Sequence, residues 1–516
     1  MKYFIHRCPD FFDWRSNTFE FKSDPGLVAQ ESSRIIQEGD YQKYLSLTSE
    51  ERRQKFLEIQ DLIEDENNPD EEKGKLLFEQ GLILASDRKY EEEIAAYDKV
   101  LEFKPDDDQA WYSKGIALSD LDRYEEAISA YDKALEFKPD DDQAWYNKGN
   151  ALKNLGKYEE AISAYDKALE FKPDYYQAWN NKGIALKNLG RYEEVISAYD
   201  KALEFKPDKD ATWYNKGNSL LDLGKCEEAI SAYDKALEFK PDKDATWYNK
   251  GNSLLDLGKC EEAISAYDKA LEFKLDKDAA WYNKGNALKN LGRYEEAISA
   301  YDKALEFKLD KDAAWYNKGN ALKNLGRYEE AISAYDKALE FKLDKDAAWY
   351  NKGNALKNLG RYEEAISAYD KALEFKPDYY QAWNNKGIAL LNLGKYEEAI
   401  SAYDKALEFK PDYYQAWNNK GNSLLNLGKY EEAISAYDKA LEFKPDYYQA
   451  WYFRGTALYR LLRFKESYAS ITKGQEINPD FAEQIFSQNI KNILTKIGWY
   501  KLKEIFTKVL IIIRLR

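Results

Sequence analysis

Residues 145–173 read WYNKGNALKNLGKYEEAISAYDKALEFKP. Apolar or small residues recur at steps of three and four in two runs, which are separated by Leu155-Gly156-Lys157. This spacing predicts two amphipathic helices joined by a tight turn. Gly156 suits the position just beyond the end of the first helix, and Pro173 stops the second. The stretch therefore predicts a helical hairpin.

The hairpin is repeated along most of the chain with a period of 34 residues. Extending the period one step towards the N-terminus places Leu77 in the tryptophan position, so the array contains twelve units over residues 77–484. Periods of this length indicate stacked supersecondary units. The tryptophans that mark the period are Trp111, Trp145, Trp179, Trp213, Trp247, Trp281, Trp315, Trp349, Trp383, Trp417 and Trp451.

Small residues inside each hairpin predict close packing of its two helices. Gly149 and Ala161 carry almost no side chain, so the helices can approach while Tyr165 fills the space beside them. Asp142, and Asp174 in the following unit, are expected to cap the first helices. The remaining apolar face of each hairpin needs a neighbouring hairpin to cover it.

The residues quoted above follow the pattern W-x3-G-x2-L, then G-[RK]-Y-E-E-A-I-x2-Y-x2-A-L-x3-P. This pattern resembles the tetratricopeptide repeat over residues 77–484. The resemblance implies an all-α, right-handed superhelical solenoid, with the first helix of each pair lining a concave groove and the second on the convex face. Local departures from the pattern are leucine in the proline position at 275, 309 and 343, and cysteine for tyrosine at 226 and 260.

The composition excludes several classes of protein. With 77 Lys plus Arg against 93 Asp plus Glu, the net charge is −16, which argues against general nucleic-acid binding. The aromatic content of 15% is too high for a disordered chain. Three cysteines do not make a disulfide framework, and residues 1–20 lack the apolar run of a signal peptide. We therefore expect a cytoplasmic location.

No motif predicts catalysis, a cofactor or a metal. The single histidine, His6, stands near the start of the chain, and no Cys/His cluster has zinc-ligand spacing. The spacing from Gly387 to Gly394-Lys395 is too long for a phosphate-binding loop, and Tyr396 stands where that loop needs Ser or Thr. We expect a protein that is not an enzyme and holds no cofactor.

Two ladders of asparagine are the candidate binding residues. A primary amide can bond both an N–H and a C=O of an extended peptide without contacting its side chains. The ladders resemble the asparagine ladder in the tetratricopeptide domain of O-linked N-acetylglucosamine transferase, and the alternatives are that they bridge adjacent helices or face water. The first ladder is Asn147, Asn181, Asn215, Asn249, Asn283, Asn317, Asn351, Asn385 and Asn419, and the second is Asn150, Asn218, Asn252, Asn286, Asn320, Asn354 and Asn422.

The residue eight positions after each tryptophan is basic in some units and apolar in others, so basic and apolar segments alternate along the predicted groove. It holds Lys153, Lys187, Lys289, Lys323 and Lys357, or Leu221, Leu255, Leu391 and Leu425. Relatives that grip chaperone C-terminal carboxylates use lysine where this chain has tyrosine or asparagine. The sequence therefore does not predict a receptor for chaperone tails.

The two ends of the chain lack the repeat. Residues 1–76 predict a divergent helical region with an acidic linker, including a helix near 27–38 and a capping box at Thr48-Ser-Glu-Glu51. Residues 485–516 carry a net charge of +6 and apolar stripes. Two interpretations of this basic amphipathic C-terminal helix remain open: it caps the solenoid, or it binds an anionic membrane surface.

These features predict a non-catalytic scaffold that holds extended peptide segments of protein partners in its groove. The alternatives are a membrane-surface adaptor anchored by residues 485–516, with peripheral membrane association, and an accessory subunit of an enzyme. No nucleic-acid partner is expected.

Overall fold

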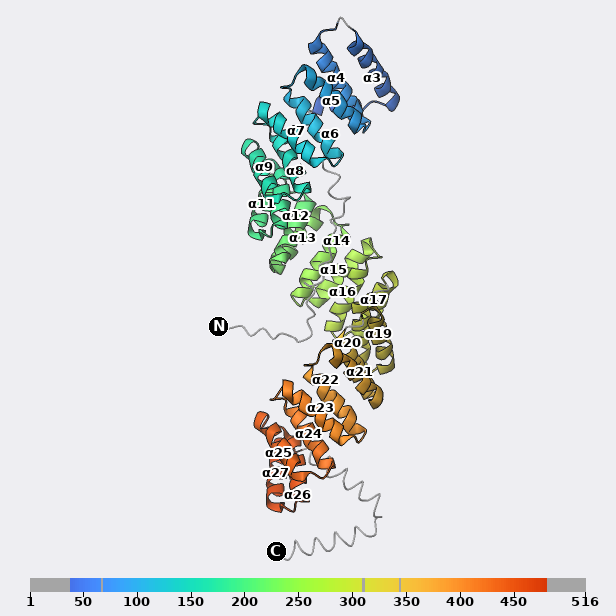
Figure 1. The fold of residues 1–516 in the computed structure, drawn as a ribbon, viewed down its shortest axis with the longest axis vertical. Coiled ribbons are helices and arrows are strands. Elements are labelled where there is room, and N and C mark those ends of the chain that lie inside the picture. Colours follow the sequence, from blue (N-terminus) through green and yellow to red (C-terminus); the bar gives the residue numbers. More distant parts are fainter. Residues whose placement is uncertain (1–37, 66–67, 309–310, 343–344, 480–516) are drawn as a thin grey trace, which may run out of the picture. The chain divides into compact units, whose positions relative to one another are not determined.

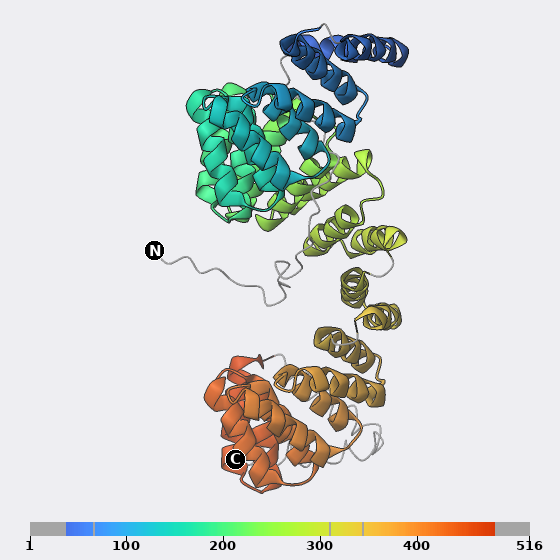
Figure 2. The same ribbon diagram turned by 45° about the horizontal axis from the view of Figure 1, so that its top comes forward.

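A computed structural model describes residues 38–65, 68–308, 311–342 and 345–479 of the chain. Within these ranges every regular element is an α-helix, as the sequence predicts. The chain forms two compact parts, residues up to Asn249 and residues from Lys250 onwards. Each part is a row of helical hairpins, and consecutive hairpins lie side by side within it (Figures 1 and 2).

The N-terminal part begins with two helices outside the repeat and continues with hairpins. Its helices are α2 (Glu38–Leu45), α3 (Ser49–Glu64), α4 (Asp70–Ser86), α5 (Tyr90–Phe103), α6 (Asp108–Asp120), α7 (Tyr124–Phe137), α8 (Asp142–Asn154), α9 (Tyr158–Phe171), α10 (Tyr176–Asn188), α11 (Tyr192–Phe205), α12 (Asp210–Asp222) and α13 (Cys226–Phe239).

The boundary between the two parts falls inside α14 (Asp244–Asp256). The C-terminal part continues with α15 (Cys260–Phe273), α16 (Asp278–Asn290), α17 (Tyr294–Phe307), α18 (Asp312–Asn324), α19 (Tyr328–Phe341), α20 (Asp346–Asn358), α21 (Tyr362–Phe375), α22 (Tyr380–Asn392), α23 (Tyr396–Phe409), α24 (Tyr414–Asn426), α25 (Tyr430–Phe443), α26 (Tyr448–Arg460) and α27 (Phe464–Ile477).

The turn inside most hairpins is made by glycine as predicted, whereas Arg88, Asp122 and Leu462 take the positive φ in three of them. Gly156 has φ = +76°, a conformation that glycine adopts without a steric penalty. Its N–H donates to Lys153 O, and the N–H of Lys157 donates to Leu152 O, so the last carbonyls of α8 are satisfied. The next helix then starts at Tyr158.

The predicted helix caps are wrong in detail. Asp141, and not Asp142, precedes α8, and its carboxylate accepts from the N–H groups of Gln143 and Ala144. In the next unit Tyr175 holds the capping position and makes no side-chain cap bond. The acidic residue of that unit, Asp174, lies one residue too early to reach the free N–H groups of α10.

The interior of a hairpin depends on the contact between a tyrosine and a glycine. Tyr165 is fully buried, and a Cβ atom at Gly149 would lie only 2.6 Å from its ring. Ala161 is also fully buried, which confirms the predicted close approach of the two helices. Trp145 donates its indole N–H to Pro139 O at 2.9 Å, which ties α8 to the loop before it.

Successive hairpins are joined by a repeated set of charges. Lys148 Nζ of α8 lies 2.5 Å from Asp132 Oδ1 of α7 and 5.1 Å from the centroid of the Trp145 ring. An ion pair and a cation–π contact thus share one ammonium group across the joint between two units. The same lysine and aspartate recur one period later as Lys182 and Asp166.

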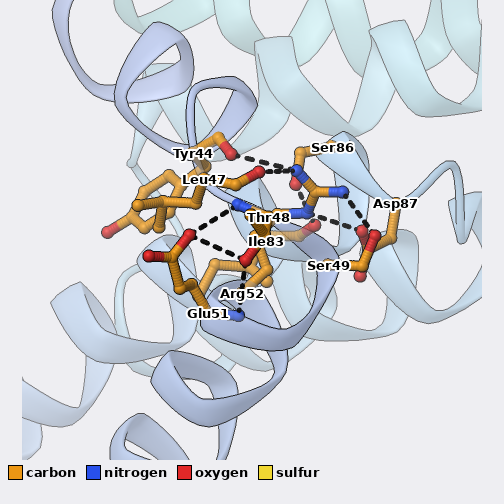
Figure 3. Close-up of polar contacts among 9 residues, drawn as sticks. All are labelled: Tyr44, Leu47, Thr48, Ser49, Glu51, Arg52, Ile83, Ser86 and Asp87. Atoms are coloured by element: carbon orange, nitrogen blue, oxygen red, sulfur yellow. Dashed lines mark hydrogen bonds and ion pairs between the residues drawn. The ribbon is translucent and has the colours of Figure 1, made fainter.

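The helices before the repeat pack on the first hairpin through α4. Thr48 and Glu51 form the predicted capping box at the start of α3. Arg52 lies at the centre of this contact and donates to Leu47 O at 2.7 Å, to Tyr44 O at 3.3 Å and to Asp87 Oδ1 at 2.7 Å (Figure 3). One guanidinium thereby joins the loop before α3 to the end of α4.

Several predictions concern residues outside the described ranges. The helix expected near 27–38 and the residues of the C-terminal segment 485–516 lie there, with the exception of Glu38 at the start of α2. Among the helices that the structure describes, none combines the length and the apolar character needed to cross a membrane.

Candidate functional site

The candidate site is the surface made by the first helices of successive hairpins. These helices contact one another along each part of the chain, for example α16 with α18, α18 with α20 and α20 with α22. They also line a depression of about 440 Å³ in the C-terminal part. Its walls are Lys323, Asn324, Tyr328, Asn354, Lys357, Asn358 and Asn385. Four of the residues predicted for the groove, Asn354, Asn385, Lys323 and Lys357, thus lie at this one surface.

All sixteen asparagines of the two ladders lie on first helices and are half-buried. Most members of the first ladder donate a hydrogen bond to the preceding unit. Phenol oxygens accept from Asn147, Asn181, Asn249, Asn317, Asn351 and Asn385, and an amide oxygen accepts from Asn181, Asn249, Asn283, Asn317, Asn385 and Asn419.

Every member of the second ladder accepts a hydrogen bond from a buried tyrosine of its own hairpin, at 2.8 or 2.9 Å. The pairs are Tyr165 with Asn150, Tyr233 with Asn218, Tyr267 with Asn252, Tyr301 with Asn286, Tyr335 with Asn320, Tyr369 with Asn354 and Tyr437 with Asn422. The second ladder therefore provides the hydrogen-bond acceptor for the hydroxyl group of these tyrosines, which are the largest fully buried side chains. Burial in turn raises the pKa of Tyr165 and Tyr301.

Asn354 shows how the two ladders combine. Its Oδ1 accepts from the Tyr369 phenol at 2.9 Å and from Asn385 Nδ2 at 2.9 Å. Asn385 Nδ2 also donates to the Tyr350 phenol at 3.1 Å. Among the described residues Asn354 Nδ2 has no acceptor, and Asn354 lines the depression.

The hydrogen bonds between units differ where the sequence departs from the common repeat. Asn180 stands where most units have tyrosine after the tryptophan, and its Oδ1 accepts from Thr212 Oγ1 at 3.1 Å. The corresponding Asn384 is buried and accepts from Asn419 Nδ2 at 3.2 Å. Between α10 and α12 the ladder bond is thus replaced by a bond from threonine, and no side-chain bond is recorded for Asn215 in the described structure.

The lysines of the predicted basic segments lie beside the ladders. Lys289 Nζ donates to Asn317 Oδ1 at 3.1 Å, and Lys323 Nζ donates to Asn351 Oδ1 at 2.9 Å. Burial lowers the pKa of Lys357, and it lowers the pKa of Lys153 to about 8. A lysine with a depressed pKa gains from a nearby anion, because the anion restores the charged form.

A set of ion pairs between consecutive units was not predicted from the sequence. Lys311 Nζ lies 3.0 Å from Asp278 Oδ2, and Lys345 Nζ lies 2.6 Å from Asp312 Oδ2, each pair joining consecutive units. Each pair spans 33 residues, one fewer than the period. The signal was the repeated Lys-Asp dipeptide at the start of first helices, but the pairing depends on the loop conformation.

In the described ranges no three His, Cys, Asp or Glu side chains come together as potential metal ligands. Cys226 and Cys260 are both buried free thiols.

Comparisons with known proteins agree with this architecture. Several tetratricopeptide repeat models match the chain and together cover well over half of it: residues 214–280, 248–314, 282–348 and 350–414; residues 143–175, 176–209 and 414–447; and residues 115–156, 96–129 and 74–107. No curated protein matches the sequence.

Solved structures of repeat proteins are similar over shorter or longer stretches. YrrB, described as a tetratricopeptide protein with an unusual peptide-binding site, is 28% identical over 36% of this chain and 96% of its own, with a TM-score of 0.34. MamA from Desulfovibrio magneticus RS-1 is 24% identical over 33% of this chain and 97% of its own, with a TM-score of 0.32. One chain of the APC/C hetero-tetramer Cut9-Hcn1 is 16% identical over 81% of this chain and 98% of its own, with a TM-score of 0.36. The repeat models, together with the glycine–tyrosine hairpins, show that this chain belongs to the tetratricopeptide repeat family.

Proposed function

We propose that the chain is a non-catalytic interaction scaffold whose repeat array, residues 77–484, holds extended peptide segments of partner proteins against its first helices. The observation that carries the proposal is the depression lined by Asn354 and Asn385, where amide groups of successive units meet at one surface. A surface that repeats one polar group at regular steps suits a ligand that also repeats, and a peptide main chain does so.

The hydrogen bonds within the ladders refine which groups serve a ligand. The Oδ1 atoms of the second ladder are used by tyrosines, as at Asn286, Asn320 and Asn354. Their Nδ2 groups are the donors we assign to peptide carbonyls. Each net hydrogen bond contributes on the order of 1 kcal/mol, so affinity builds up over several units and no single residue dominates.

The test separates the ligand role of these asparagines from their structural role. Asn286→Asp, Asn320→Asp and Asn354→Asp together keep an oxygen acceptor for each tyrosine and remove the Nδ2 donors. The matched control is Ser299→Asp, Ser333→Asp and Ser367→Asp, which adds the same charge at exposed positions on the second helices of the same hairpins.

The probes are peptides enriched on the purified chain from a random display library, with the uncharged ones chosen for titration. We expect the ladder variant to weaken an uncharged peptide by roughly a hundredfold, discounted for incomplete additivity, and the control to weaken it much less. Equal affinities for the two variants, with helix content intact in both, would remove the asparagines from the proposed binding site.

A further inference from the structure

Three consecutive hairpins of the C-terminal part carry lysine at the same position near the end of the first helix. The residues are Lys289 on α16, Lys323 on α18 and Lys357 on α20, and each is half-buried beside the asparagine ladders. Lys323 and Lys357 line the same depression. The flanking units have Leu255 and Leu391 at this position, so the basic stretch is bounded on both sides.

In the N-terminal part a carboxylate lies beside the equivalent lysine. Lys187, the equivalent lysine on α10, forms an ion pair with Asp222 Oδ2 of the next first helix at 3.2 Å. In the unit of α12, Leu221 stands at the lysine position, and Asp222 is the next residue. In the three-lysine stretch that place is taken by neutral amides, Asn324, Asn358 and Asn392.

The lining of the depression is therefore rich in donors. It contains two ammonium groups, four amides and the Tyr328 phenol, and no acidic residue is among its walls. Charge-assisted bonds from lysine to a carboxylate are about twice as strong as bonds between neutral groups. The lowered pKa of Lys357 indicates that burial has made an unpaired ammonium unfavourable there.

We propose that the stretch from α16 to α20 binds an acidic segment of a partner protein, with carboxylates at every third residue in an extended conformation. Packed helices lie about 10 Å apart, and an extended chain advances about 3.3 Å per residue. One hairpin thus corresponds to three peptide residues. Each peptide carboxylate forms an ion pair with its lysine in the same way that Asp222 pairs with Lys187. The inference rests on the proposed peptide-binding function and names the chemistry of its ligand.

The test uses the full chain and three synthetic peptides in fluorescence anisotropy. The first peptide has glutamate at every third position and serine elsewhere, the second has the same composition with adjacent glutamates, and the third has glutamine in place of glutamate. We expect the first peptide to bind at least tenfold more tightly than either of the others, and to lose affinity as salt is raised.

Two variants test the lysines themselves. Lys289→Gln, Lys323→Gln and Lys357→Gln together should weaken the spaced glutamate peptide by about a hundredfold. The matched control is Lys303→Gln, Lys337→Gln and Lys371→Gln, which removes the same charge from the second helices of the same hairpins. These lysines pair with Glu306, Glu340 and Glu374, and their loss should change affinity less than threefold.

A further variant keeps all three lysines and supplies a carboxylate from within the chain to two of them, Lys289 and Lys323. Asn324→Asp with Asn358→Asp recreates the arrangement of Lys187 and Asp222, and it should weaken the spaced peptide by at least tenfold. Binding of that peptide with no dependence on the lysines or on the spacing overturns the acidic-ligand inference but leaves the scaffold proposal standing. If the glutamine peptide binds as tightly as the spaced glutamate peptide, the inference also fails. If none of the three peptides binds, the inference fails and the library experiment above decides the scaffold proposal.

Discussion

Asn385 donates an amide hydrogen to Asn354 at 2.9 Å, although the two residues belong to different hairpins. The accepting oxygen also satisfies the phenol of Tyr369, which is fully buried in the hairpin of Asn354. The asparagine ladder is therefore part of the structure that joins the units, as well as the candidate ligand surface. Asparagine at this position links packing within a hairpin to packing between hairpins.

We expect Asn354→Ala to destabilise the protein. The substitution leaves the buried Tyr369 hydroxyl and an amide proton of Asn385 without an acceptor, which costs about 1–3 kcal/mol. Urea denaturation followed by circular dichroism measures the loss. Asn358→Ala is the control, because Asn358 is exposed on the same helix, and it should stay within about 0.5 kcal/mol of wild type. Equal effects of the two substitutions would contradict the role given to Asn354.

The close approach of glycine and tyrosine makes a second prediction. A Cβ atom at Gly353 would lie 2.6 Å from the Tyr369 ring, so Gly353→Ala forces the helices of that hairpin apart. Overpacking of this kind costs about 1–3 kcal/mol.

Gly74→Ala provides the control for that change. Gly74 lies inside α4, where no heavy atom would come within 4 Å of the added Cβ. There the substitution should stabilise the protein by about 0.5–1 kcal/mol, because alanine favours the helix. Thermal melts of both variants should shift in opposite directions, and a stabilising Gly353→Ala would refute the packing described here.

The repeat made most of the fold predictable. The tryptophan period, the glycine after most first helices and the small residues at Gly149 and Ala161 are local signals, and the structure confirms the hairpins they predict. The capping box of Thr48 and Glu51 was equally local. In each case the residues that interact lie within one hairpin or one helical turn, so periodicity alone locates them.

Contacts between units were not predictable in the same way. The sequence left three roles open for the asparagines, and the structure shows the bridging role for most of the first ladder. The ion pair of Lys345 with Asp312 was missed, because it joins residues of neighbouring units that lie 33 positions apart in the sequence. Asp141 replaced Asp142 as a cap since helix boundaries shift easily by one residue.

The buried tyrosines predict unfolding at alkaline pH. Burial raises the pKa of Tyr165, Tyr233 and Tyr301 in the folded protein, whereas tyrosine in the unfolded chain ionises near pH 10. Above that pH the unfolded chain holds fewer protons than the folded one. Stability from these residues is therefore complete below about pH 10 and falls as pH rises further.

A pH titration that records phenolate absorbance and helical circular dichroism on the same sample checks this expectation. The buried tyrosines should ionise only as the helices are lost, so their part of the absorbance change should coincide with the loss of circular dichroism. Phenolate formation by all tyrosines with full helical signal would show that the phenols bonded to the asparagines reach solvent in the folded state.

Leu275 should be replaceable by proline at no cost. Lys274 before it has φ = −141° and ψ = 87°, close to the −138° and 82° of Lys240, which precedes Pro241 in the neighbouring repeat. Trp281 donates its indole N–H to Leu275 O at 3.0 Å, just as Trp247 donates to Pro241 O at 2.8 Å. The backbone of the preceding residue and the bond to the carbonyl at Leu275 thus match those at Pro241. Because Leu275 is 64% exposed, its side chain contributes little packing.

Leu275→Pro should stabilise the protein by about 0.4–1 kcal/mol through the lower entropy of the unfolded chain. Urea denaturation measures this change, and the helix content should stay unchanged. A loss above about 2 kcal/mol would show that this loop differs from its proline-containing counterparts.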